Sequence, residues 1–382
     1  MSRYLFVVPP FVAHVNPSVS IGQALAQSGH AVAWVTYPQM RPLLPAGATL
    51  YPVASTVDES SAEDLKRRSG APWLAGMKAL FEQVIVPMAH DMLPTVDTAI
   101  EDFHPDLLIV DQQALAGALA ARRRQLRWVT SAPSAALLRD SLAAYPMVKV
   151  WKAALFDQLQ RDAGLVPIAT PDCSPDLVIL YSSRLLAGAG REFPAHYRFV
   201  GPALDRRPES VDFPWHRLRD GPILFVTLGT LFAEQGQRFF RTVVDALAGA
   251  PVQVIVGARP ELLPSIPDNF IVQRWVPLTD LLPRLDAVLC HGGTVVNEAL
   301  AHGIPAVVAP FAHEQSIYAQ LITEAGAAVR VRFNRVNAAE LRRAVFEVLD
   351  NPVYAAAARR VQVSLVDAGG ARAAAAAIEQ LA

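Results

Sequence analysis

The sequence of 382 residues lacks the features that define several protein classes. Its two cysteines, Cys173 and Cys290, lie far apart and outside any Cys/His ligand spacing, so neither a disulfide framework nor a zinc site is indicated. No apolar run reaches the roughly 18 residues of a membrane span, and the apolar stretch before Pro9 is too short for a signal peptide. These absences favour a cytoplasmic protein without an integral membrane segment.

An excess of charge is also missing. Lys and Arg number 34 against 35 Asp and Glu, and no long basic cluster occurs beyond Arg122 to Arg124. We therefore expect no nucleic acid partner, and we expect the arginine trio to be a solvated helix end. Two common nucleotide motifs are absent as well, because there is no P-loop sequence and no G-x-G-x-x-G after the first predicted strand.

Apolar runs and helical segments, by contrast, alternate along most of the chain. Hydrophobic residues make up 52% of the sequence, which indicates large cores, and the length favours two domains. One alternation of strands and helices runs from Tyr4–Val8 to Leu177–Leu180, and a second runs from Ile223–Thr227 to Ala306–Ala309. This pattern predicts an α/β protein with two doubly wound, Rossmann-like parallel sheets.

The boundary between the two alternations lies in residues 201–215, which are rich in proline, glycine and charge and show no periodicity. We expect an N-terminal domain over 1–203, a linker over 204–216 and a C-terminal domain over 217–365. A final helix over 366–382 could pack back on the first domain.

Ligands of open parallel sheets bind beyond the carboxyl ends of the strands, so the residues at these ends are candidates. His14 follows the first strand, in a loop that we expect to end at the helix cap Asn16 and the first helical residue Pro17. Asp111 directly follows the strand Leu107–Val110. By position alone, each is more often a solvated or capping residue than a functional one.

Three strand ends of the second domain are candidates for the same reason. Gly229 and Thr230 follow Ile223–Thr227 and suit an anionic oxygen, Trp275 could stack on a base, and His291 to Gly293 precede a helix N-terminus that would favour a phosphate. The structural alternatives are an ordinary strand-ending turn, a core tryptophan and a strand-to-helix turn.

Six motifs occur in order along nearly the whole chain. They are H-V-N-P at 14–17, V-T-L-G-T at 226–230, P-D-N-F-I-V-Q-R-W-V-P at 267–277, C-H-G-G at 290–293, E-A-L-A-H-G-I-P at 298–305 and H-E-Q at 313–315. In this order and spacing they make the chain resemble the bacterial antibiotic and macrolide glycosyltransferases of the GT-B fold, which belong to the UDP-glycosyltransferase family, glycosyltransferase family 1.

The resemblance implies two domains that face each other across a cleft and an inverting transfer of a hexose or deoxyhexose. The donor would be a UDP- or dTDP-sugar used as co-substrate, and the acceptor a hydroxyl of a lipophilic natural product such as a polyketide, macrolide or aromatic aglycone. No metal and no further cofactor would be required. By position, His14 would be the general base and Asp111 would orient it.

The same resemblance implies a set of donor-binding residues in the second domain. They are Gly229, Thr230, Trp275, Val276, His291, Gly293, Thr294, Asn297, Glu298, Glu314 and Gln315. Trp275 and Val276 would bind the base, Glu298 the ribose, and Glu314 and Gln315 the sugar hydroxyls. His291, Gly293, Thr294 and Thr230 would hold the diphosphate.

The sequence departs from the family pattern in the segment between Gly293 and Glu298, where one more residue is usual. This shorter loop supports one alternative function, a catalytically degenerate GT-B protein that acts as a helper or binding partner. A sugar-nucleotide epimerase is a further alternative. The sequence specifies neither the acceptor, nor UDP against dTDP, nor the oligomeric state.

Overall fold

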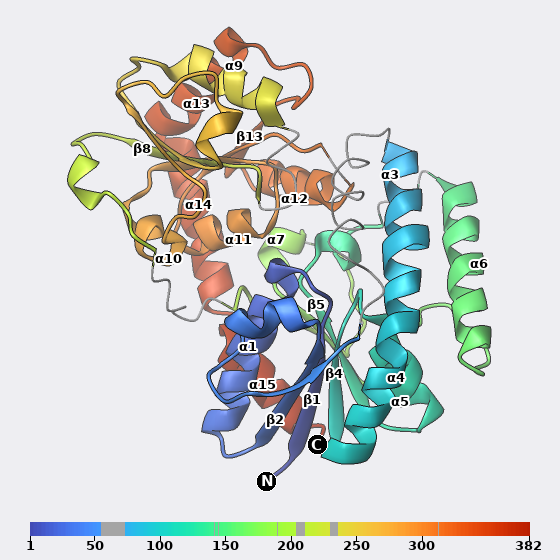
Figure 1. The fold of residues 1–382 in the computed structure, drawn as a ribbon. Coiled ribbons are helices and arrows are strands. Elements are labelled where there is room, and N and C mark those ends of the chain that lie inside the picture. The colour runs from blue at the N-terminus through green and yellow to red at the C-terminus, as the bar shows by residue number, and fades with distance from the viewer. Residues whose placement is uncertain are drawn as a thin grey trace. The chain divides into compact units, whose positions relative to one another are not determined.

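A computed structural model describes residues 1–54, 73–140, 142–143, 145–188, 190–203, 211–229, 236–311 and 313–382, without the side chains of 73–75, 313 and 314. These residues divide into two compact units. Unit 1 comprises Met1–Ser183, Gly190–Asp205 and Ala368–Ala382, and unit 2 comprises Arg184–Ala189 and Arg206–Asp367. Both units carry a parallel sheet with helices on both faces, so the predicted fold class is confirmed (Figure 1).

The sheet of unit 1 has the strand order β3-β2-β1-β4-β5-β6-β7, and every pairing is parallel. Its strands are β1 (Arg3–Val7), β2 (Ala31–Thr36), β3 (Thr49–Pro52), β4 (Leu107–Asp111), β5 (Trp128–Ala132), β6 (Leu177–Leu180) and β7 (Tyr197–Phe199). Its helices are α1 (Val12–Gln27), α3 (Trp73–Leu80), α4 (Val86–Phe103), α5 (Leu115–Arg123), α6 (Pro146–Asp162) and α15 (Gly370–Glu379), with a π-helical turn over Phe81–Ile85.

Alternate residues of each central strand face two separate cores in unit 1. Tyr4 and Phe6 of β1 pack in one core with α1 and α15, while Leu5 and Val7 pack in the other with α4 and α5. Figure 1 shows α1 and α15 on one side of β1, and α4 and α5 on the other. Because both faces are covered, the strands are continuous apolar runs, as expected for a parallel sheet.

The first helix differs from the prediction. It begins at Val12 rather than at Pro17, so Asn16 is not its cap and Pro17 lies inside it. His14 is therefore in the first turn of α1 and not in a loop. Burial of Val15, together with later residues on the same helix face, extends the helix toward β1 and outweighs the hydrogen bond that Pro17 cannot donate.

The sheet of unit 2 has the order β10-β9-β8-β11-β12-β13, again with all pairings parallel. Its strands are β8 (Ile223–Thr227), β9 (Gln253–Gly257), β10 (Phe270–Gln273), β11 (Ala287–Cys290), β12 (Ala306–Val308) and β13 (Ala328–Arg330). Its helices are α7 (Arg184–Ala187), α9 (Gln237–Leu247), α10 (Leu278–Leu281), α11 (Thr294–Ala301), α12 (His313–Glu324), α13 (Ala338–Asp350) and α14 (Pro352–Val366). Helices α9 and α13 share a core with the sheet through Phe240 and Val345.

Two short segments belong to a unit other than the one that their sequence neighbours suggest. Residues 184–189 group with unit 2, where α7 contacts α12 and α14, although the sequence boundary places them before 203. Helix α15 belongs to unit 1 and packs on α1. Among the helices of the described residues, none is long and apolar enough to cross a membrane.

Candidate active site and donor site

The topology of unit 1 brings His14 and Asp111 together. The strand order reverses between β1 and β4, since the chain proceeds outward from β1 to β3 on one side and from β4 to β7 on the other. Such a switch point leaves a crevice at the carboxyl ends of the two strands. His14 lies in the helix after β1 and Asp111 is the last residue of β4, so both are placed at this crevice.

The two side chains form a buried hydrogen bond. His14 Nδ1 is 2.9 Å from Asp111 Oδ2, and the other carboxylate oxygen accepts the backbone N–H of Gln113 at 2.9 Å. Asp111 is 2% exposed and His14 is 9% exposed, and the ring of Phe11 meets the imidazole edge-on at a centroid distance of 5.6 Å.

This geometry fixes the chemistry of the imidazole. An ionised carboxylate only accepts hydrogen bonds, so Nδ1 carries the hydrogen and Nε2 presents its lone pair. The ring can therefore take up a proton at Nε2, and the resulting imidazolium is stabilised by Asp111. The sequence did not indicate a role for Gln113. Its backbone N–H donates to the Asp111 carboxylate two residues earlier, as in an Asx-turn, and so orients Asp111.

The switch point of unit 2 lies between β8 and β11, where glycines surround a buried histidine. A Cβ on Gly229 would lie 2.9 Å from His291 Cε1, and one on Gly293 would lie 2.5 Å from His291 Nε2. Gly292 has φ +88°, and a Cβ there would meet the backbone oxygen of Gln315 at 2.9 Å. All three positions therefore require glycine for this close approach.

The imidazole of His291 is neutral in this buried position and can act as a hydrogen-bond donor. Burial lowers the pKa of its ring to about 4, and a hydrogen bond with the Thr227 backbone opposes that shift only partly. Its ring also lies against Phe311 at a centroid distance of 5.8 Å. At neutral pH such a ring contributes hydrogen bonds to an anion but no full positive charge.

Trp275 is on the surface beyond the end of β10. It is 53% exposed, so it is not a core tryptophan, and the Arg274 guanidinium lies 5.6 Å from its ring centroid. Val276 follows it and is half-buried. An exposed indole at a strand end is available for stacking against a planar ligand.

The remaining residues predicted to bind the sugar donor differ in burial and in hydrogen-bond partners. Thr294 begins α11 and is half-buried, as is Glu298 one turn later. Asn297 is 4% exposed and donates through Nδ2 to Tyr318 Oη at 3.0 Å, a partner that the sequence did not indicate. Gln315 accepts the Phe311 N–H through Oε1 at 3.1 Å.

For two of the residues predicted to bind the sugar donor, the structure does not describe the side chain. Thr230 is outside the described residues, and so is the side chain of Glu314. Among the side chains that are described, no group of three or more His, Cys, Asp or Glu could hold a metal ion.

Comparison with known proteins relates both the sequence and the fold to glycosyltransferases. Residues 241–375 match the family model described as "Erythromycin biosynthesis protein CIII-like, C-terminal domain". The 4'-demethylrebeccamycin synthase of Lentzea aerocolonigenes is 28% identical over 94% of this chain and 95% of its own length. The NDP-glycosyltransferase YjiC of Bacillus subtilis (strain 168) is 28% identical over 97% of this chain and 95% of its own.

Solved structures resemble the whole chain. The calicheamicin glycosyltransferase CalG4 superposes with a TM-score of 0.78 at 25% identity, covering 100% of this chain and 98% of that one. The glycotransferase of kitacinnamycin gives a TM-score of 0.81 at 24% identity, covering 99% and 98%. The glycosyltransferase VinC, solved in complex with dTDP, gives 0.77 at 21% identity, covering 99% of each chain.

Proposed function

We propose a reaction from the premise that this chain is a nucleotide-sugar-dependent glycosyltransferase of the GT-B fold, with an EryCIII-like C-terminal domain in residues 241–375. The reaction is the inverting transfer of a hexose or deoxyhexose from a UDP- or dTDP-sugar to a hydroxyl of a lipophilic natural product. The names of the relatives support this substrate class, since they include enzymes of rebeccamycin and calicheamicin chemistry. The dTDP complex of VinC supports a nucleoside diphosphate donor.

The observation that carries the proposal is the buried His14–Asp111 hydrogen bond at the switch point of unit 1. In the proposed step, His14 Nε2 takes the proton of the acceptor hydroxyl while its oxygen attacks the anomeric carbon. The bond from that carbon to the diphosphate oxygen breaks, and its electron pair leaves with the diphosphate. Attack from the face opposite the leaving group inverts the configuration, and Asp111 stabilises the imidazolium.

In this proposal unit 2 binds the donor. Trp275 stacks on the base, Val276 offers its backbone to the base edge, and Glu298 binds the ribose. The diphosphate lies at the N-terminus of α11, where it is bound by the residues that follow β8 and β11. These residues are Gly229, Thr230, His291, Gly293 and Thr294, with Asn297 further along α11.

Glu314 and Gln315 complete the donor site by binding sugar hydroxyls. Because His291 is held neutral, the charge that develops on the leaving diphosphate is stabilised by hydrogen bonds and the α11 dipole. The transfer therefore needs no metal in this proposal.

The test is incubation of the protein with a panel of UDP- and dTDP-sugars and of aromatic and macrolide acceptors. We expect a mass increase of one acceptor by one sugar residue, with inverted anomeric configuration by NMR. A retained configuration would exclude the inverting step. Sugar isomerisation without an acceptor would instead identify an epimerase, and donor binding without any transfer would identify a helper protein.

A further inference from the structure

A pocket of about 200 Å³ in unit 2 is lined by Pro310 and by residues 330–335. Three of the lining residues are the arginines Arg330, Arg332 and Arg335, and Asn334 is another. We propose that this pocket is a second anion site, separate from the donor site, that binds a phosphate dianion. The phosphate would be free or the terminal group of a small phosphate ester.

The charge in the pocket is uncompensated within the described part of the chain. No aspartate or glutamate is among the described residues that line it, and none of the three arginines forms an ion pair with another described residue. By contrast, Arg123 and Arg124 of unit 1 are paired with Asp97 and Glu101. Several guanidinium groups that share one pocket repel one another, and a phosphate that accepts bidentate hydrogen bonds relieves this repulsion.

The backbone that carries these arginines is rigidly held. The Arg332 carbonyl accepts the N–H groups of Arg335 at 2.9 Å and of Val336 at 2.8 Å. Arg238 donates to the carbonyls of Phe333 at 3.3 Å and Val336 at 3.4 Å, which fixes the turn from its other side. A fixed turn lowers the entropy lost when long side chains converge on a ligand.

Phe333 anchors the same turn in the core of unit 2. It is 9% exposed and stacks on Phe239 at a centroid distance of 4.9 Å. Its ring also contacts Phe311 at 4.6 Å, and Phe311 contacts His291 at 5.8 Å. One aromatic side chain therefore lies between the arginine pocket and the histidine of the donor site.

The pocket is nevertheless distinct from the proposed diphosphate position. The residues proposed to hold the diphosphate follow β8 and β11, whereas the arginines lie at the end of β13 and in the turn after it. Strand β12 separates β11 from β13, which places the two strand ends about 10 Å apart at the usual strand spacing. A phosphate in the pocket therefore occupies a different place from the leaving diphosphate.

Calorimetric titration of the full-length protein tests the site. Inorganic phosphate is one probe and glucose 6-phosphate is the other, and the tighter binder identifies the source of the phosphate group. We expect Arg332→Gln/Arg335→Gln to weaken binding at least tenfold. The matched control is Arg359→Gln/Arg360→Gln, which removes the same charge from two exposed residues of α14 and should leave binding unchanged.

Unchanged binding in the pocket variant, or equal weakening in the control, would overturn the proposal. Thermal unfolding confirms that each variant is folded, and Arg330→Gln alone, with an expected loss of several-fold, replaces the double variant if that one does not fold. The readout needs neither donor nor acceptor, so a failure of the proposed transfer reaction leaves this result interpretable.

Discussion

The hydrogen bond with Asp111 favours one tautomer of His14, since Asp111 Oδ2 is 2.9 Å from Nδ1 and both side chains are buried. We predict that His14→Ala lowers kcat by about 100-fold or more, the usual contribution of a general base. Asp111→Asn should cause a comparable loss, since an amide can donate to Nδ1 and so place the hydrogen on Nε2. Steady-state kinetics would measure both.

A nucleotide-binding measurement shows whether these variants have lost only the general base or have also lost the native fold. Both should bind UDP or dTDP as the wild type does, because the proposed donor residues belong to unit 2. His90→Ala is the matched control, since its side chain is 48% exposed and it should turn over normally. Near-normal turnover of His14→Ala would remove His14 from the role of base.

Gly293 is required by the position of His291 rather than by its own backbone, whose φ of −84° suits any residue. The Cβ of Gly293→Ala would lie 2.5 Å from His291 Nε2, so the ring must shift. We expect nucleotide binding to weaken about tenfold or more, with a loss of about 1–3 kcal/mol in the free energy of unfolding. Gly76→Ala, whose added Cβ would meet nothing within 4 Å, is the control for nucleotide binding.

The pKa of His291 gives a pH prediction with a definite sign. Its folded value of about 4 lies below the unfolded value of about 6.5, so the unfolded chain binds the proton first as pH falls. This residue alone should lower the free energy of unfolding by about 2 kcal/mol between pH 7 and pH 5. Urea titrations at both pH values should show a smaller decrease for His291→Asn, and an equal decrease would contradict the assigned burial effect.

At the scale of elements, the sequence predicted best where burial is complete. β6 and β8 have the predicted bounds, because continuous apolar runs leave little choice. The strands β3, β7 and β13 were missed, since they are short and include half-buried or exposed residues. Short edge strands are specified by pairing with neighbours that a local pattern does not contain.

In the candidate site, too, some features could be predicted from the sequence and others could not. The residues at the strand ends could be found from the sequence because their place in a doubly wound sheet is fixed by order alone. Contacts across the chain could not. Neither the Asn297–Tyr318 hydrogen bond nor the packing of Gly229 against His291 follows from spacing, since each depends on how separate elements meet.

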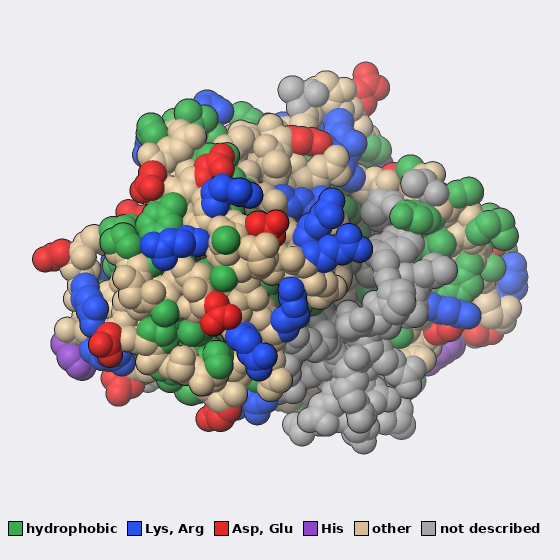
Figure 2. Space-filling view, turned by 90° about the horizontal axis from the view of Figure 1, so that it is seen from above, with side chains coloured by type: hydrophobic (Ala, Val, Ile, Leu, Met, Phe, Trp, Pro, Cys, Tyr) green, Lys and Arg blue, Asp and Glu red, His purple; other side chains and the backbone are tan. Residues whose placement is uncertain are grey.

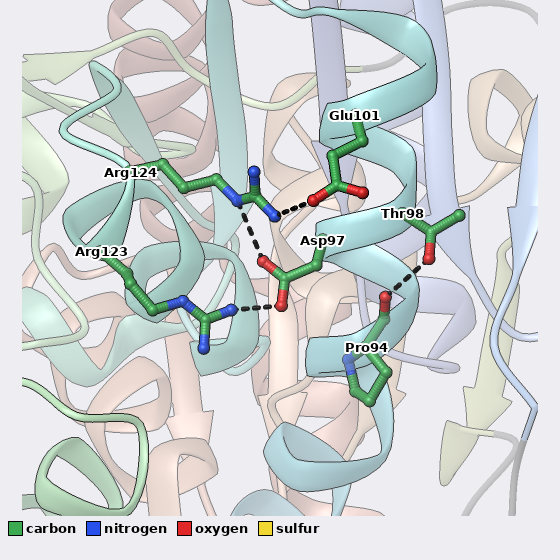
Figure 3. Close-up of polar contacts among 6 residues, drawn as sticks. All are labelled: Pro94, Asp97, Thr98, Glu101, Arg123 and Arg124. Atoms are coloured by element: carbon green, nitrogen blue, oxygen red, sulfur yellow. Dashed lines mark hydrogen bonds and ion pairs between the residues drawn. The ribbon is translucent and has the colours of Figure 1, made fainter.

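Helices α4 and α5 are joined by an ion-pair network that the sequence did not indicate (Figure 3). Arg123 and Arg124, expected to be solvated, both bind Asp97, and Arg124 also donates to Glu101 at 2.6 Å. Figure 3 shows Asp97 between the two arginines, with Glu101 one turn further along α4. The network fixes the end of α5 against α4.

We predict that Asp97→Ala lowers the free energy of unfolding by only about 0.5–1 kcal/mol, since these side chains are partly exposed and screened. The effect should shrink in about 1 M NaCl, where the Debye length is near 3 Å. Asp157→Ala, which removes an i,i+4 pair with Arg161, should cost less. If denaturant titrations showed the same loss in the free energy of unfolding for both variants, the network would not stabilise the fold more than an isolated ion pair.

For the whole molecule, the C-terminal helix links the end of the chain to the stability of unit 1. Ile378 is fully buried in the same core as Ile21 and Leu25 of α1. We predict that Ile378→Ala lowers the free energy of unfolding of unit 1 by about 2–4 kcal/mol. Val363→Ala in α14 of unit 2, where the side chain is 58% exposed, should change little.

Calorimetry resolves this effect by unit. We expect Ile378→Ala to lower only the transition of unit 1, and UDP or dTDP to raise only that of unit 2. A nucleotide that raised the transition of unit 1 instead would contradict the proposed donor site. In the view of Figure 2, basic, acidic and apolar side chains are interspersed on the described surface.

Residues on both sides of 206–367 belong to unit 1, so most of unit 2 is, in genetic terms, an insertion between Asp205 and Ala368. A chimaera that takes only residues 206–367 from a relative would exchange the proposed sugar-nucleotide half except for its short segment Arg184–Ala189. A crossover near residue 203 that keeps the relative's own terminus would instead set a foreign α15 against the native α1. The route to hybrid enzymes with new donors is therefore two crossovers, one near residue 205 and the other between Asp367 and Ala368.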